Sequence, residues 1–303
     1  MEVIEKDLFK GDELDLKVAL SIIWHKKIQI ILITSFFAIF SIFYALSIPN
    51  TYESRAIVAP VDEDMPVGGS LGGFGSLVGI NLGSSSNNID QTIAVLNSHI
   101  FLSNFIEKHQ ISPILMAVKG WDITKDALVF DSNIYDVEKK KWVTSFGTQK
   151  KSSPSIQGQV KSFREIYSVA KDRTSGLITI SVKFFSPNIS KKWVNWIVED
   201  INSYMKDEKI KSANIVLNYL NREILKTNIS EVRNVLADLI KKETQTIALS
   251  KKSSEFVFKT IDPAIAPEIK SGPFRSIICI VITIFGFIIS LIYVFLIYFL
   301  RRS

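Results

Sequence analysis

The chain has 303 residues, enough for one or two domains with a sizeable core. Hydrophobic residues make up 47% of it, which is high for a wholly soluble protein. A single cysteine excludes an intrachain disulfide, and a net charge of +6 does not indicate a nucleic-acid partner.

Two long apolar runs account for the surplus of hydrophobic residues. Residues 28–48 run for 21 positions without a charge, and residues 277–300 run for 24. At about 1.5 Å per residue, each could cross a hydrocarbon core of about 30 Å, and both are predicted to be transmembrane helices. A cleaved signal peptide is the alternative for the first run, because Ala45 and Ser47 resemble a small-x-small cleavage site. The long, partly acidic leader favours an uncleaved span.

The charges that flank the two spans predict their orientation. A histidine and two lysines precede the first span at positions 25–27, and two arginines follow the second at 301–302. Because cytoplasmic flanks are rich in lysine and arginine, both termini are predicted to be cytoplasmic and residues 49–275 to lie outside. Arg275 is the one charge that argues against this orientation.

The region after the first span alternates between strand and helix patterns. A strand is predicted at 52–61, an amphipathic helix at 89–109, and a short helix at 155–163. Two strands at 165–170 and 177–185 form a predicted hairpin with Gly176 at its bend. These elements predict an α/β layer close to the membrane.

A glycine-rich segment at 66–86 holds seven of the fourteen glycines. None of its glycines is followed by lysine, and its G-x-G is not followed by a glycine at the required spacing, so it does not fit a phosphate-binding loop. Apolar residues such as Leu71 and Phe74 are spaced among the glycines. We expect the segment to be a membrane-proximal element that contacts another subunit or the bilayer.

Residues 188–242 contain neither proline nor glycine. Apolar positions from Ile210 to Leu239 recur every 3.6 residues on average, and their heptad is interrupted between Ile224 and Leu225. This period predicts one long, nearly straight helix of about 80 Å rather than a sustained coiled coil.

The chain then has to return to the membrane. Residues 243–259 are the predicted return, and Pro263, Pro267 and Pro273 are expected to form a stiff entry into the second span.

Candidate chemistry is sparse in this sequence. It has three histidines without a metal-binding spacing, no G-x-S-x-G motif, and its only cysteine, Cys279, lies in the second span. The sequence therefore predicts neither an enzyme nor a cofactor or metal site. Trp193 and Trp196 begin the long helix and are expected to be core or subunit contacts, with stacking on a glycan as the alternative.

Three blocks of sequence resemble the polysaccharide co-polymerases, the Wzz-type chain-length determinants of Gram-negative surface polysaccharides. They are DELDLKVALSIIWHKKIQIILITSFFAIFSIFYALSIPNTYESRAIVAP, PSIQGQVKSFREIYSVAKDRTSGLITISVKFFSPN and EFVFKTIDPAIAPEIKSGPFRSIICIVITIFGFIISLIYVFL. The resemblance implies a non-enzymatic regulator in the bacterial inner membrane that assembles into bell-shaped homo-oligomeric rings. Its implied partners are an O-antigen-type polymerase and the lipid-linked polysaccharide.

Two positions depart from the family pattern. Phe274 stands where a lysine is common, and Gly286 is the only glycine of the second span, where a helix contact through small residues would call for more.

The fold class predicted from these patterns is an α+β membrane protein. Two transmembrane helices flank a periplasmic domain with an α/β base and a long helical arm. The predicted parts are a cytoplasmic segment (1–27), the first span (28–48), the base (49–187), the long helix with its return (188–259), the proline-rich segment (260–276), the second span (277–300) and a cytoplasmic end (301–303).

Three functions stay open from the sequence. The first is regulation of the modal chain length of an O-antigen-type polysaccharide. The second is a role in capsule or exopolysaccharide export, and the third is a sensor or enzyme, which lacks any supporting motif.

Overall fold

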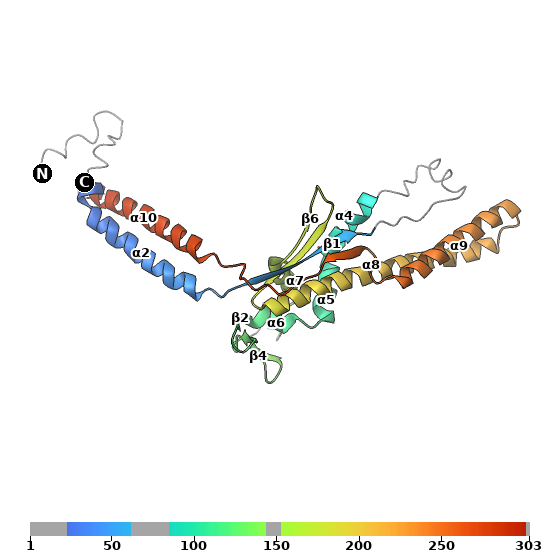
Figure 1. Cartoon of the computed structure of the whole chain (residues 1–303), viewed down its shortest axis with the longest axis horizontal. Helices are drawn as coiled ribbons and strands as arrows, with labels where there is room; N and C mark the ends of the chain where they lie inside the picture. The colour runs from blue at the N-terminus through green and yellow to red at the C-terminus, as the bar shows by residue number, and fades with distance from the viewer. Residues whose placement is uncertain (1–22, 62–84, 144–152, 301–303) are drawn as a thin grey trace, which may run out of the picture. The chain divides into compact units, whose positions relative to one another are not determined.

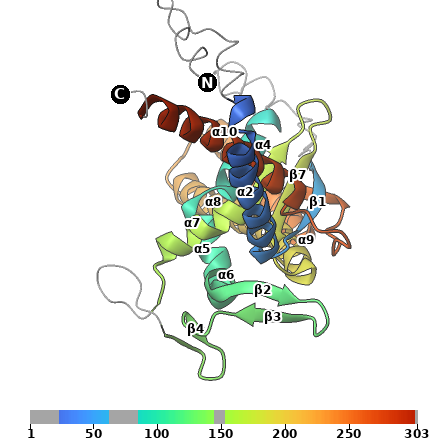
Figure 2. The same ribbon diagram turned by 90° about the vertical axis from the view of Figure 1, so that its left-hand side faces the viewer.

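The computed structural model describes residues 23–61, 85–143 and 153–300. It divides into two compact units, one with the chain up to Asn50 and from Ser271 onward, the other from Thr51 to Lys270. Figures 1 and 2 show the elements of each unit from two directions.

The first unit is a pair of apolar helices, α2 (Lys27–Ser47) and α10 (Arg275–Leu300). Each is long and apolar enough to cross a membrane. Both helices lie within two residues of the predicted spans, so the two apolar terminal helices of the predicted fold are confirmed.

The second unit is built on a four-stranded sheet in the order β6-β7-β1-β8, in which every pair of neighbours is antiparallel. Its strands are β1 (Tyr52–Pro60), β6 (Tyr167–Lys171), β7 (Ile178–Phe184) and β8 (Phe258–Asp262). The predicted β6–β7 hairpin is confirmed, and Gly176 at its bend has a φ of +71°, which is a conformation that favours glycine.

One face of this sheet carries the core of the unit. Alternate residues of the two central strands, such as Ala56, Val58, Ile180 and Val182, are buried, as expected for a sheet with one covered face. Helix α8 (Pro187–Ile224) packs on this face against β1 and β7, and α5 (His99–Lys108) packs on α7 (Ile156–Ile166) beside it.

The single helix predicted for residues 89–109 is wrong, because the chain forms two helices there. Helix α4 (Ser85–Leu96) ends before Asn97, and the hydroxyl of Ser98 accepts a hydrogen bond from the amide of Phe101 to cap α5. Arg164 of α7 also donates to the carbonyl of Asn97 at 2.8 Å, which holds the break between α4 and α5 in place.

The single 55-residue helix predicted for 188–242 is also wrong. Helix α8 ends at Ile224, and α9 (Ser230–Lys252) packs against it. The amides of residues 256–258, just beyond α9, bond to Asn202 in the first half of α8, so the two helices run antiparallel (Figure 1). We call residues 206–252, which form this two-helix extension, the arm.

The break in the arm has a local cause. It falls between Ile224 and Leu225, where the apolar heptad shifts by one residue. The amide of Lys226 donates to the carbonyl of Glu223, and Arg233 donates to the carbonyl of Thr227, so two carbonyls at the turn find partners close by in the chain. Packing of α9 on α8 then covers Leu220, which a straight helix would leave exposed.

Helix α6 (Ser112–Ala117) leads into two small antiparallel ribbons outside the main sheet. Their strands are β2 (Val118–Asp122), β3 (Ala127–Phe130), β4 (Tyr135–Asp136) and β5 (Lys141–Trp142). Figure 2 shows both ribbons to one side of the helices that cover the sheet. The mixed helix-and-sheet fold with a long helix and two apolar terminal helices matches the predicted fold class.

Candidate functional site

The two apolar helices meet along a seam of small and polar residues. Ser41 and Ala45 of α2 and Ser290 of α10 are almost fully buried. A Cβ atom placed on Gly286 would overlap Phe37, so this glycine lets the two helices approach closely. The helix contact therefore uses two serines and an alanine besides the one glycine of the second span. The sequence-based expectation considered only the glycine.

Arg275 lies at the end of the seam where α2 finishes. Its Nε donates to the carbonyl of Ala45 at 3.1 Å, and its Nη2 donates to the carbonyl of Ile48 and the side chain of Asn50. The last carbonyls of a helix have no partner within the helix, and in a membrane such groups are costly to leave unpaired. The charge that argued against the predicted orientation thus has a local structural role as a cap on the first apolar helix.

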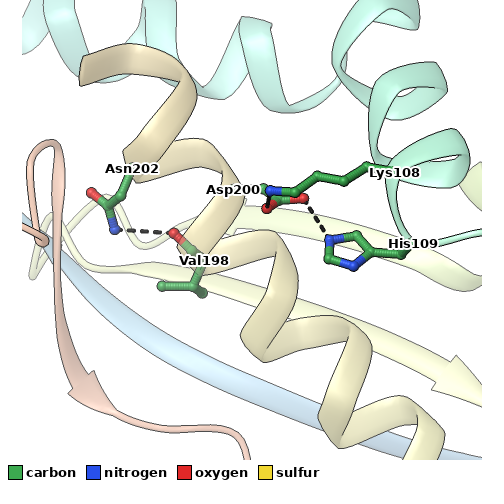
Figure 3. A network of polar contacts seen from close by, with 5 residues as sticks. All are labelled: Lys108, His109, Val198, Asp200 and Asn202. Atoms are coloured by element: carbon green, nitrogen blue, oxygen red, sulfur yellow. Dashed lines mark hydrogen bonds and ion pairs between the residues drawn. The ribbon is translucent and has the colours of Figure 1, made fainter. Parts of the chain in front are cut away.

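A buried asparagine joins the arm to the sheet. The Oδ1 of Asn202 accepts hydrogen bonds from the amides of Phe256, Val257 and Phe258, each at 2.9 Å. Its Nδ2 donates to the carbonyls of Val198 and Phe258, and Figure 3 shows the first of these bonds. All hydrogen-bonding positions of this amide are engaged, so Asn202 fixes the connection between the end of α9 and the start of β8.

A second polar cluster links α5 to α8 (Figure 3). Asp200 accepts from the Nζ of Lys108 at 2.6 Å and lies 2.8 Å from the Nε2 of His109. The ring of His109 also stacks on Trp196 at 4.0 Å between centroids, and the Nζ of Lys192 lies over the same indole at 4.6 Å. Because these partners all come from the same unit, the cluster stabilises helix packing rather than presenting free groups to a ligand.

The two tryptophans predicted at the start of the long helix have different surroundings. Trp193 is fully buried and its ring contacts Phe163 and Phe184 in the core of its own unit. Trp196 is half-buried, and its ring is engaged by His109 and Lys192. Neither indole therefore offers an unoccupied platform for stacking on a sugar.

The remaining predicted contact residues are spread along the chain. Pro263 is exposed, Pro267 and Pro273 are half-buried, and none of them touches the polar clusters described above. Leu71 and Phe74 lie outside the described residues. Helix α4 begins at the end of the glycine-rich segment, and beyond that segment Asp90 of α4 pairs with Lys171 at the end of β6 at 2.7 Å.

Two residues that organise the structure were not singled out from the sequence, Asn202 and Asp200, and Arg275 was noted there only for its charge. A signal for Asn202 exists, because it follows the buried series Trp193, Ile197 and Ile201, where a polar residue requires partners. The partners themselves are more than fifty residues away, so no local pattern could name them.

The arm exposes a series of large apolar side chains. Its members are Ile215, Val216, Tyr219, Leu225, Ile229, Val232, Val235 and Leu249. Leu225, at the turn between α8 and α9, is 85% exposed. Such a concentration on a narrow extension is typical of a surface that another protein covers.

Groups of acidic, histidine and cysteine side chains suited to a metal ion do not occur within residues 23–61, 85–143 and 153–300.

Comparison with known proteins gives one family match. Residues 12–109 match the family model described as "Wzz: Chain length determinant protein". No curated protein matches the chain.

The chain also aligns with solved structures, two of which are polysaccharide co-polymerases. A full-length bacterial polysaccharide co-polymerase is 12% identical, with 95% of this chain and 99% of that one covered and a TM-score of 0.42. A fragment of the polysaccharide co-polymerase WzzB from Salmonella Typhimurium is 10% identical, with 74% and 100% covered and a TM-score of 0.28. Both scores lie below 0.5, so the resemblance rests on residues 12–109, which include α2, β1, α4 and α5. This match confirms the resemblance of the chain to the Wzz-type chain length determinants.

Proposed function

We propose that this protein sets the modal length of a bacterial surface polysaccharide of the lipopolysaccharide O-antigen type. It acts without catalysis, as an oligomeric scaffold for the polymerase and for the growing glycan that the polymerase makes. The observation that carries the proposal is the match of residues 12–109 to the chain length determinants. The two apolar helices on either side of the α/β unit support it, because they provide a membrane anchor at each end of residues 51–270.

The location proposed for the protein is the bacterial inner membrane. Both termini lie in the cytoplasm, and the unit from Thr51 to Lys270 lies in the periplasm. The flanking positive charges support this orientation, and Arg275 no longer opposes it because its guanidinium caps α2.

The proposed assembly is a ring of identical subunits. The exposed apolar residues of the arm support it, because a monomer would leave them in water. A ring of arms would give the polymerase and a lipid-linked glycan a surface of defined size, which is the physical basis proposed for a preferred chain length.

Deletion of the gene and analysis of the surface polysaccharide on a gel test the proposal. We expect the modal cluster of chain lengths to be replaced by a distribution without a preferred length. Reintroducing the wild-type chain should restore the cluster. The control variant Gln245→Ala, which changes an exposed position of the arm, should restore it equally well.

The same gel separates the alternative function. If deletion removes the surface polymer altogether, the protein is an export component of the capsule or exopolysaccharide kind. An unchanged length distribution would refute the regulatory proposal.

A further inference from the structure

The two small ribbons, residues 118–143, form a surface that the proposed function does not use. We call them the ribbon pair. They stand apart from the main sheet, and none of residues 119–143 is buried. Such an appendage contributes little to the core, so its side chains are available for a contact elsewhere.

The ribbon pair is fixed to Tyr52, which follows the last residue of α2 by five positions in the chain. The ring of Trp121 in β2 packs edge-to-face on Tyr52, the first residue of β1, at 5.5 Å. Asp126 holds this arrangement, because it accepts from the indole of Trp121 at 2.9 Å and from Asn188 at 3.1 Å. Helix α2 ends at Ser47, so at most about 18 Å of extended chain separates the end of the helix from Tyr52.

The turns of the ribbon pair carry exposed aliphatic side chains. Ile123, in the turn between β2 and β3, is 64% exposed. Val137, in the turn between β4 and β5, is 50% exposed, and Val143 directly after β5 is 58% exposed. Single aliphatic residues at turn tips are poorly suited to the continuous flat face of a stable protein interface, but they can enter the headgroup layer of a bilayer one at a time.

Lysines surround these aliphatic tips. Five exposed lysines lie in the ribbon pair: Lys119, Lys125, Lys139, Lys140 and Lys141. Five acidic residues lie there too, so the net charge of the ribbon pair is zero, and Lys139 pairs with Asp136 at 3.4 Å. Lys140 and Lys141 follow directly in the chain and are the two lysines offered to the lipid. Several nearby carboxylates are engaged in the turns, where Asp122 accepts from the amide of Thr124 and Asp136 from that of Lys139. The amide of Lys139 also lowers the pKa of Asp136, so this turn keeps its carboxylate ionised and hydrogen-bonded.

We propose that the ribbon pair binds the surface of the phospholipid bilayer that holds α2 and α10, with Ile123 and Val137 in the headgroup layer and the lysines on anionic lipid phosphates. Tryptophan, tyrosine and lysine are the residues that membrane proteins favour at this depth. The short connection from Ser47 to Tyr52 brings the ribbon pair within reach of the same surface. The proposal rests on the membrane anchoring in the proposed function.

A glycan is a weaker candidate for this surface. A sugar-binding platform needs an open aromatic face, and the aromatic rings here are partnered. Trp142 packs on Tyr135 at 5.0 Å, and Trp121 on Tyr52. Exposed aliphatic tips also lack the hydrogen-bonding groups that a sugar requires.

Lipid-dependent quenching of a fluorescent label on the full-length chain tests the proposal. In a Cys279→Ser background, single cysteines replace the residues of interest and carry an environment-sensitive fluorophore. The chain is reconstituted in vesicles of phosphatidylethanolamine and phosphatidylglycerol that include a lipid with a nitroxide at a shallow position or, for the label on α2, near the bilayer centre. We expect labels at Ile123→Cys and Val137→Cys to lose emission to the nitroxide, and Leu225→Cys at the arm turn to lose none.

A label at Phe36→Cys, on an exposed position of α2, separates the two proposals. If Phe36→Cys is quenched and both ribbon labels are not, the membrane anchor stands and the ribbon proposal is overturned. If Phe36→Cys is not quenched either, the anchoring and the ribbon proposal fail together. Emission shifted to the blue without quenching would show that another copy of the chain covers the ribbons, which also overturns the proposal.

The lysines have their own test in the same vesicles. A lysine at an anionic surface contributes about a five-fold increase in binding. The double substitution Lys140→Gln and Lys141→Gln should therefore reduce the quenching at Val137→Cys, while that at Phe36→Cys stays unchanged. Replacing phosphatidylglycerol with phosphatidylcholine should likewise reduce the quenching at Val137→Cys in the chain that keeps both lysines. If neither change alters this quenching, the electrostatic part of the proposal is overturned.

Discussion

Tyr167 is a single buried residue with an unmet requirement. Its ring stacks on Phe163 in the core, and its hydroxyl has no hydrogen-bond partner among the residues that the structure describes. Burial also raises the pKa of this phenol above its ordinary value of 10.0. A buried hydroxyl without a partner costs about 1–3 kcal/mol, which a phenylalanine at this position would not incur.

We therefore expect Tyr167→Phe to raise the free energy of unfolding by about 1 kcal/mol. Thermal unfolding in detergent measures the change, and Tyr219→Phe is the matched control because its side chain is exposed.

The dependence of stability on pH has a defined sign. The unfolded chain ionises Tyr167 first, so stability is present below the ordinary pKa of 10.0 and falls as the pH rises above it. Tyr167→Phe should lose less stability in that alkaline range, and a destabilised variant would show that the hydroxyl has a partner.

Asn202 gives a second prediction at the residue scale. Asn202→Ala leaves three backbone amides without an acceptor, at a cost of several kcal/mol in total. We expect hydrogen exchange at residues 256–258 to accelerate strongly, with little change in the β6–β7 hairpin. Asn202→Asp keeps the acceptor but loses the donor to the carbonyls of Val198 and Phe258, so it should preserve only part of the protection. Equal exchange in both variants would contradict the role assigned to the carboxamide oxygen.

At the scale of elements, the contact between α2 and α10 along the seam can be tested by a cross-link. The Sγ of Cys279 lies 3.8 Å from the carbonyl oxygen of Ser41, so the two helices meet at this level. We expect Ser41→Cys to form a disulfide with Cys279 under mild oxidation, visible as a cross-link after cleavage between the spans. Ile42→Cys, on the exposed side of α2, should not cross-link within the chain.

The same cross-link tests the glycine of the seam. Gly286→Leu would place a side chain where Phe37 already lies, so the helices should separate and the yield of the cross-link should fall. An unchanged yield would mean that Gly286 does not control the approach of the helices.

The elements also show where sequence reasoning works and where it stops. The apolar helices and the β6–β7 hairpin were predictable, because charge-free runs and a turn glycine are local signals. The ends of α4 and α8 were missed. The break at Asn97 has a local signal in Ser98, the N-cap of α5, but the bond from Arg164 that also meets it comes from 67 residues away. The turn after Ile224 coincides with the shift of the heptad, but the packing of α9 on α8 that accompanies it is not visible in a local pattern.

The contact residues also divide into those with a local signal in the sequence and those without one. The approach of Gly286 to Phe37 agrees with the small size of glycine, which a sequence shows directly. Asn202 needs acceptor and donor partners at residues 256–258, and Trp196 has a histidine partner on α5. Pairings of this kind become visible only when the fold brings the elements together.

At the scale of the whole molecule, the open question is what covers the arm. A free arm would expose Val235, Leu225 and the other apolar residues of this surface to water. Contact between copies of the chain removes this surface from water without any further partner, and it agrees with the proposed ring.

We therefore expect the chain in detergent to be a homo-oligomer that Val235→Asp dissociates. The substitution places an unpaired carboxylate in each contact between subunits, which costs several kcal/mol per contact. Gln245→Asp adds the same charge at an exposed polar position of α9 and is the matched control. Light scattering after size-exclusion chromatography measures the mass of both variants. A full-mass oligomer with Val235→Asp and unchanged thermal unfolding would place the subunit contacts outside the arm. Loss of mass in that variant alone would link the apolar surface of the arm to assembly, and the polysaccharide gel would then show whether assembly is what sets the chain length.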